Sequence, residues 1–125
     1  MTYFYDSSEI MRVELVPGLT IRTMWGEKIM MSVIENEPNA EVPMHTHPHE
    51  QAGIVMEGGF DMTIGEETRR MKPGMAYVIP GGVPHGIKGI DVKGKALDIF
   101  SPPREEYKEK IKSVDPRWKE EGASS

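Results

Sequence analysis

The stretch that decides the fold is Glu41-Val42-Pro43-Met44-His45-Thr46-His47-Pro48-His49-Glu50-Gln51. It holds three of the chain's four histidines within five residues. On a β-strand, residues two apart point to the same face, so His45 and His47 can bind one ion. Imidazole is a common ligand for divalent transition metals. The stretch therefore predicts a strand that carries part of a metal site.

The fourth histidine, His85, follows a turn-forming run, Pro80-Gly81-Gly82. Proline fixes one backbone dihedral of a turn and glycine takes the positive one, so this run predicts a turn just before His85. Gly58 and Gly74 stand between the two histidine stretches, with fifteen residues between them. Three clustered histidines, with a fourth in a turn framed by proline and glycine, favour a metal site over separate structural roles for each histidine.

Together the two stretches resemble the cupins, small β-barrel proteins that carry two sequence motifs. The first motif, Gly-x5-His-x-His-x3–4-Glu-x6-Gly, corresponds to the stretch from Asn39 to Gly58. The second, Gly-x5-Pro-x-Gly-x2-His-x3-Asn, corresponds to the stretch from Gly74 to Gly89, and the spacing between the motifs is that of microbial cupins. The resemblance implies an all-β fold, a single-domain cupin double-stranded β-helix (jelly-roll) barrel with a short C-terminal helix. It also implies metal ligands at His45, His47, Gln51 and His85.

The sequence departs from the cupin motifs at three positions. Asn39 replaces the first glycine, a mild change because Asn tolerates a left-handed backbone, and Gly89 replaces the final asparagine. Gln51 replaces the usual glutamate ligand, and its amide oxygen brings no charge, so we expect weaker binding of an ion that is a stronger Lewis acid. Glu50 is the alternative ligand, but one residue along a strand reverses the face, which favours Gln51.

Three imidazoles and one amide leave roughly two open positions on an octahedral ion, as catalysis or ligand binding requires. We therefore expect one divalent transition metal ion, and Ni, Fe, Mn, Co, Cu and Zn all accept these ligands. His49 follows Pro48, which favours a turn, so we interpret His49 as a residue at the rim of the site.

The run Leu97-Asp98-Ile99-Phe100-Ser101-Pro102-Pro103-Arg104 adds a second group of candidate residues. Asp98 and Phe100 share one strand face, and the pattern alone leaves open whether that face points into the barrel or to solvent. With the histidine stretches, this run resembles the uronate-linearising cupins (KdgF-type) of pectin and alginate breakdown. The resemblance implies ring opening of 4,5-unsaturated monouronates to the linear keto form.

That resemblance also implies roles for three side chains. Asp98 is expected to be the general acid or base, Phe100 an apolar wall for the sugar, and Arg104 the partner of the substrate carboxylate. A solvent-exposed Arg104 at the start of the last helix is the alternative. Two other functions stay open: another metal-dependent cupin enzyme such as a dioxygenase, or a non-catalytic small-molecule-binding cupin. The family further implies a homodimer.

Length and composition limit the number of domains, the kinds of site and the partners that the chain can have. A chain of 125 residues predicts one domain over residues 1–125, with a barrel core at about 19–101 and a C-terminal helix and tail at about 104–125. No cysteine is present, which excludes disulfides and thiolate metal sites. The net charge of −5 gives no support for nucleic acid or a membrane as partner. The resemblance to the uronate-linearising cupins implies a small anionic sugar acid as the substrate. Residues 1–6 do not have the pattern of a signal peptide, so we expect a cytoplasmic protein.

Glycine and proline divide the chain into short segments, a pattern typical of an all-β protein. Gly58-Gly59 predicts a β-hairpin, and Lys72-Pro73-Gly74 a further turn. A C-terminal helix is predicted from the spacing of Tyr107, Ile111, Val114 and Trp118, with Pro116 ending or kinking it and 120–125 as a tail. The expected strands are 19–25, 28–36, 40–46, 52–57, 59–64, 67–71, 76–79, 85–89 and 95–100.

Overall fold

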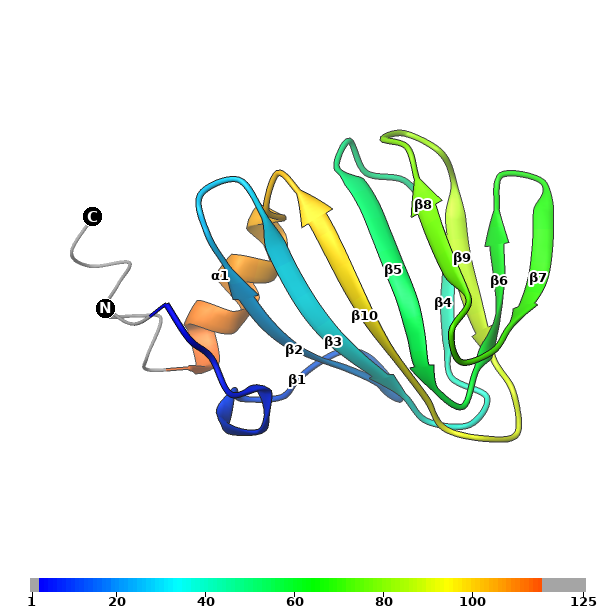
Figure 1. Ribbon diagram of the computed structural model, residues 1–125, viewed down its shortest axis with the longest axis horizontal. Coiled ribbons are helices and arrows are strands. Elements are labelled where there is room, and N and C mark those ends of the chain that lie inside the picture. The colour runs from blue at the N-terminus through cyan, green and yellow to red at the C-terminus, as the bar shows by residue number, and fades with distance from the viewer. Residues whose placement is uncertain (1–2, 116–125) are drawn as a thin grey trace.

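The computed structural model describes residues 3–115, and most of its regular secondary structure is β-strand (Figure 1). A short 3-10 helix, η1 (Ser7–Glu9), precedes the strands, and one α-helix, α1 (Glu105–Val114), follows them. In the described part of the chain no helix is long and apolar enough to cross a membrane. The strands are β1 (Val13–Val16), β2 (Leu19–Trp25), β3 (Met30–Asn36), β4 (Glu41–His45), β5 (Glu50–Glu57), β6 (Phe60–Ile64), β7 (Glu67–Met71), β8 (Ala76–Ile79), β9 (His85–Gly89) and β10 (Gly94–Ser101).

The strands form two antiparallel sheets, as the all-β expectation requires. A six-stranded sheet has the order β1-β2-β3-β10-β5-β8, and a four-stranded sheet has the order β4-β9-β6-β7. Residues alternate between the two faces of each strand: along β10, Ala96, Asp98 and Phe100 are buried while Leu97 and Ile99 are partly exposed. The inward face of β10 therefore carries both Asp98 and Phe100.

The predicted hairpin at Gly58-Gly59 is wrong, because β5 and β6 belong to different sheets. The chain crosses between the sheets at this point instead of reversing beside itself. A Cβ at Gly58 would lie 1.7 Å from the Lys93 carbonyl oxygen, and one at Gly59 would lie 2.3 Å from the Met71 carbonyl oxygen. The two glycines are thus needed for close backbone contact at a crossover, and not for a tight turn within one sheet.

Two hydrophobic clusters fill the interior, and α1 belongs to the first. Tyr107 and Ile111 of α1 pack with the inward residues Val13, Ile21, Met30 and Phe100. The second cluster lies between the sheets and consists of Val55, Phe60, Met62, Met71, Tyr77, Ile79 and Ala96. The helix therefore packs against the barrel over β1, β2 and β3 (Figure 1).

All nine predicted strands are present, and four of them have the predicted bounds, 19–25, 67–71, 76–79 and 85–89. The first strand, β1, was not predicted. The C-terminal helix is confirmed to Val114, whose side chain is 48% exposed. Pro116, Trp118 and the tail at 120–125 lie outside the described residues.

The turns of the two histidine stretches bring those stretches together. Asn39 has a φ of 63°, the left-handed conformation expected where the motif has glycine. The backbone N–H of Gly82 donates to the carbonyl oxygen of His47 at 2.9 Å. A Cβ at Gly81 would lie 2.2 Å from the Pro48 carbonyl oxygen, so the turn before His85 packs directly on the loop after His45.

Candidate metal centre

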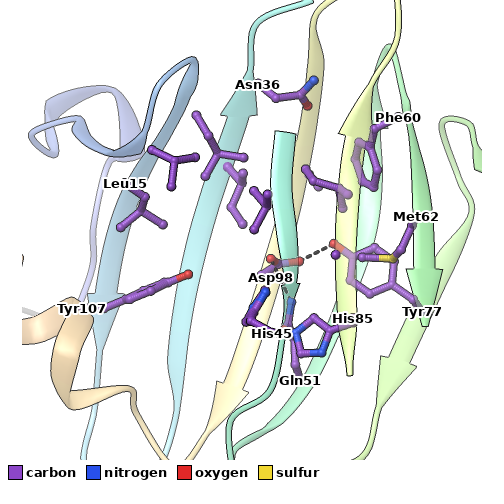
Figure 2. Close-up of a pocket in the computed structure, with 17 residues that line it drawn as sticks. Leu15, Asn36, His45, Gln51, Phe60, Met62, Tyr77, His85, Asp98 and Tyr107 are labelled. Carbon is purple, nitrogen blue, oxygen red and sulfur yellow. Dashed lines mark hydrogen bonds between the residues drawn. The ribbon is translucent and has the colours of Figure 1, made fainter. Parts of the chain in front are cut away.

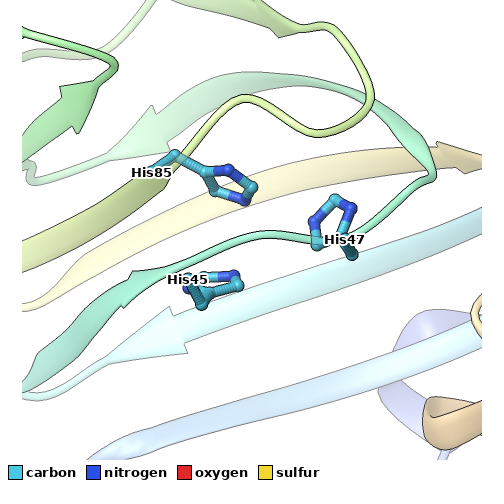
Figure 3. Close-up of side chains that lie close together, drawn as sticks. All are labelled: His45, His47 and His85. Carbon is cyan, nitrogen blue, oxygen red and sulfur yellow. The ribbon is translucent and has the colours of Figure 1, made fainter.

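Three histidines meet at the ends of β4 and β9 (Figure 3). His45 ends β4 and lies opposite His85, the first residue of β9, while His47 lies in the loop that follows β4. The ring centroids of His45 and His85 are 4.4 Å apart, and those of His47 and His85 are 4.8 Å apart. One ligand atom from each of the three lies within 4.8 Å of the others, which is close enough for all three to bind one ion.

Backbone hydrogen bonds orient all three rings in the same way. Each Nδ1 lies 2.9–3.0 Å from a carbonyl oxygen, that of Pro43 for His45, of His49 for His47 and of Val83 for His85. A carbonyl oxygen only accepts, so each Nδ1 carries the proton and each Nε2 of a neutral ring keeps a free lone pair. This arrangement, in which Nδ1–H is held by a carbonyl and Nε2 is left free, is typical of metal-binding histidines.

The glutamine at the position of the usual glutamate faces the histidines. Gln51 is 6% exposed, and its Nε2 donates to Asp98 Oδ2 at 3.2 Å, which turns its Oε1 toward His47 Nε2 at 3.0 Å. With the His47 proton on Nδ1, two lone-pair atoms face each other here, an arrangement that a bound cation would stabilise. The alternative ligand Glu50 is exposed on the opposite face of β5.

Burial favours the neutral, metal-binding form of two of the three imidazoles, those of His47 and His85. It lowers the pKa of His47 and of His85 below the ordinary value, and the positive charge of Arg104 lowers both further. His85 Nε2 is also buried without a hydrogen-bond partner, although a buried polar atom of this kind normally has one. The donor set and the unpartnered nitrogen together fit a divalent transition metal ion.

Asp98 lies beside this group, in a cavity of about 100 Å³ between the two sheets (Figure 2). The Tyr77 hydroxyl donates to Asp98 Oδ1, and the Gln51 amide donates to Oδ2. Burial raises the pKa of Asp98 to about 7, although these bonds and the charge of Arg104 act in the opposite direction. A carboxyl group with a pKa near neutrality is suited to both giving and accepting a proton.

The cavity wall is mainly apolar. His45, Gln51, His85 and Asp98 lie close together at one end of it, whereas Asn36 lies at the opposite end (Figure 2). The polar lining residues are Asn36, His45, Gln51, Tyr77, His85, Asp98 and Tyr107, and the apolar ones are Leu15, Val16, Leu19, Ile34, Val42, Phe60, Met62, Ile87 and Ala96.

Phe100 and Arg104 lie near the histidines but do not line this cavity. The Phe100 ring packs edge-on against His47, with centroids 5.9 Å apart, and is 1% exposed. Arg104 is 7% exposed, contrary to the solvent-exposed alternative, and lines an adjoining groove together with His45 and Tyr107. Its guanidinium group stacks on the Tyr107 ring, donates to the Tyr107 hydroxyl at 3.0 Å and forms an ion pair with Glu106.

His49 lies next to His47 and outside the group of three. Its carbonyl oxygen accepts the His47 Nδ1 proton, and the two ring centroids are 5.4 Å apart. Sequence reasoning missed Tyr77 and Gly53, which both lie against the Asp98 carboxyl group. One signal was available for Tyr77: a tyrosine on the inward face of a strand needs a partner for its hydroxyl group.

Comparison with known proteins places this geometry in a family. The family model described as "Cupin domain" matches residues 32–100. The pectin degradation protein KdgF of Dickeya dadantii is 30% identical over 107 residues, which cover 84% of this chain and 96% of that protein. The H2HPP isomerase of Bacillus subtilis is 36% identical over 94 residues, which cover 73% of this chain but only 39% of that protein.

Solved structures agree with the sequence matches. The structure of KdgF from Halomonas sp. superposes with a TM-score of 0.79 at 27% identity, over 86% of this chain and 99% of that one. An RmlC-like cupin from Shewanella frigidimarina has a TM-score of 0.80 at 25% identity, over 86% and 96% of the two chains. The barrel, the spacing of the histidines and these relatives all lead to one conclusion: the chain belongs to the cupin-domain family and is similar to KdgF.

Proposed function

We propose that the chain is a metal-dependent enzyme that opens the ring of 4,5-unsaturated monouronates to the linear keto form. The observation that carries the proposal is the position of Asp98. Its carboxyl group is buried, has a pKa of about 7 and is hydrogen-bonded to Gln51, whose other end faces the histidines. The likeness to KdgF, a pectin degradation protein, supplies the substrate class, a small sugar acid.

The proposed reaction is an isomerisation and needs no second substrate. The anomeric hydroxyl loses its proton as the bond between C1 and the ring oxygen breaks, and the ring oxygen takes up a proton, which gives an aldehyde at C1 and an enol at C5. The enol hydroxyl then loses its proton while C4 gains one, which gives a ketone at C5. Asp98 is assigned these proton transfers, since a group with a pKa near neutrality can both accept and return a proton.

Four residues are assigned to hold the metal ion: His45, His47, Gln51 and His85. When bound, a divalent ion supplies positive charge that stabilises negative charge on a substrate oxygen. Gln51 adds no charge of its own, so the full charge of the ion is left to act on the substrate. The Nδ1 hydrogen bonds hold the imidazoles in place for this role.

Arg104 is assigned to the substrate carboxylate. Its guanidinium group is held by Tyr107 and is now paired with the Glu106 carboxylate, whose side chain is 63% exposed. A substrate carboxylate can replace Glu106 there, because planar guanidinium groups bind carboxylates through two parallel hydrogen bonds. Phe100 is assigned to supporting His47 from the apolar side, a more indirect role than a wall in contact with the sugar.

Proton NMR of freshly generated 4,5-unsaturated galacturonate, and of unsaturated mannuronate and guluronate, tests the proposal. We expect the metal-loaded protein to accelerate the loss of the vinyl proton signal. Chelator-treated protein and the Asp98→Asn variant, which keeps the size of the side chain, are expected to lose most of this acceleration. A wild-type rate equal to the rate without enzyme contradicts the proposal for these substrates.

A second candidate is isomerisation of a different, less polar small molecule. It is favoured by the apolar lining of the cavity and by the 36% identity to an H2HPP isomerase, although the chain spans only 39% of that protein. The same Asp98 and metal ligands would serve, so the substrate distinguishes the two candidates. A homodimer and a cytoplasmic location stay predictions.

A further inference from the structure

We propose that Tyr77 is a positioning residue, which holds the Asp98 carboxyl group in its working orientation by reaching across Gly53. The inference rests on the proposed function, because it takes Asp98 as the proton-transfer group. It concerns a contact in the interior of the six-stranded sheet that the sequence motifs do not include. The contact joins β8 to β10, two strands that are not neighbours.

The sheet register explains how the two side chains meet. β5 lies between β10 and β8, and its Gly53 is directly opposite Asp98 on one side and Tyr77 on the other. All three positions face the interior, so a side chain at position 53 would separate the other two. A Cβ there would lie 2.4 Å from Asp98 Oδ1 and 2.4 Å from the Tyr77 hydroxyl oxygen. Glycine at this position thus leaves the space in which the hydroxyl donates to the carboxyl group (Figure 2).

The hydrogen bonds at Asp98 fix the carboxyl group from two sides. Oδ1 accepts from the Tyr77 hydroxyl, and Oδ2 accepts from the Gln51 amide. A carboxyl group held at both oxygens cannot rotate freely about its last bond, so the lone pairs that remain open to the cavity have a fixed direction. Because Gln51 also faces His47, this direction is set relative to the candidate metal ligands.

Packing alone does not explain the tyrosine. The Tyr77 ring fills space in the cluster between the sheets, which a phenylalanine ring would fill equally well. The hydroxyl adds a buried polar group, which is costly unless it has a partner, and Asp98 is that partner. The structure therefore assigns the hydroxyl to the carboxyl group and the ring to the core.

The variant Tyr77→Phe tests the assignment, with Thr23→Val as its matched control. Thr23 is 1% exposed in the same sheet, and its hydroxyl group bonds to Ser32 instead of Asp98. We expect Tyr77→Phe to lower kcat on unsaturated uronates by about 10- to 100-fold, with KM within about twofold of wild type, because misplacement of a reacting group chiefly slows the chemical step. Bound metal per chain is expected to stay at the wild-type value. Thr23→Val is expected to keep the wild-type kcat.

Gly53→Ala gives a second and independent variant. It keeps both the hydroxyl and the carboxyl group but places a methyl group between them, so we expect the same fall in kcat as for Tyr77→Phe. Should Gly53→Ala not fold, Tyr77→Phe decides alone. A Tyr77→Phe variant with the kcat of Thr23→Val, or with a changed metal content, overturns the inference.

A double-mutant cycle separates this inference from the proposed function. Tm is measured for Tyr77→Phe, for Asp98→Asn and for the combination. A combined loss smaller than the sum of the two single losses supports the contact, and an additive loss overturns it. If the wild-type protein does not accelerate the loss of the vinyl proton signal, the proposed function is contradicted. The double-mutant cycle then decides the inference about Tyr77 by itself.

Discussion

The amide of Gln51 has a different partner at each end, and a carboxylate in its place could not donate the hydrogen bond to Asp98. Its oxygen faces His47 and its nitrogen donates to Asp98. In Gln51→Glu two carboxylates meet, so the added charge is expected to tighten binding of Ni²⁺ or Mn²⁺ by about tenfold or more, while repulsion from Glu raises the pKa of Asp98 further and lowers activity. Competition with a coloured chelator measures the affinity. Glu50→Gln, on the exposed face of β5, is the control, and an unchanged affinity in Gln51→Glu contradicts the account.

The buried Asp98 predicts a pH dependence of stability. Its pKa rises from 3.8 in the unfolded chain to about 7 in the fold, so between these values the unfolded state has lost a proton that the folded state keeps. The free energy of unfolding of the wild type, minus that of Asp98→Asn, is therefore highest at low pH. It falls as the pH rises, by up to about 1.4 kcal/mol per pH unit, and stays level above about pH 7. Urea unfolding of the metal-free proteins from about pH 4 to 8 measures this difference. A difference independent of pH contradicts the raised pKa.

Sequence spacing and the cupin motifs together could indicate the four candidate ligands but not the surroundings of Asp98. His45 and His47 pair by their spacing on a strand, whereas Gln51 and His85 were identified from their places in the two motifs. The Tyr77 contact depends on which strands become neighbours in the sheet, and no local pattern contains that information. For the same reason the alternation of residues along 97–100 could not decide whether Asp98 faces the interior or the solvent, since that depends on how the two sheets pack.

Among the elements, the turn before β9 is what brings His85 to the other two histidines. Gly81 packs on the Pro48 carbonyl oxygen, and Gly82 bonds to His47. Gly81→Ala is expected to push the turn away and to lower metal affinity at least about tenfold, besides costing more than about 1 kcal/mol of stability. Gly74→Ala is the control: it has a φ of 90° and an open environment, so it costs stability, about 1 kcal/mol, but leaves metal affinity unchanged. Isothermal titration with Ni²⁺ measures the metal affinity of both variants. Equal affinities contradict the role given to the turn before β9.

Strand positions were predictable because turn residues mark their ends, whereas sheet membership was not. Val13–Val16 was missed although Pro17 and Gly18 follow it, since four residues give little periodicity. The error at Gly58-Gly59 has a related cause. A pair of glycines marks a sharp change of direction, and only the partners of β5 and β6 decide whether that change is a hairpin or a crossover.

At the scale of the whole molecule, α1 covers the part of the six-stranded sheet that the four-stranded sheet leaves open. Ile111 is 1% exposed within the cluster that includes Phe100, so it supports the apolar side of the candidate site. Ile111→Ala is expected to lower the free energy of unfolding by about 2–5 kcal/mol, and Lys112→Ala by less than about 0.5 kcal/mol. Chemical denaturation measures both. A loss below 1 kcal/mol for Ile111→Ala contradicts this packing.

The candidate metal centre lies between the two sheets, where His45, His47, Gln51 and His85 converge next to Asp98. Anomalous diffraction from crystals of the protein loaded with a single metal, recorded at the absorption edge of that metal, tests this metal centre most directly. We expect one strong peak in contact with the three Nε2 atoms and Gln51 Oε1. A peak elsewhere, or none at saturating metal, contradicts this expectation.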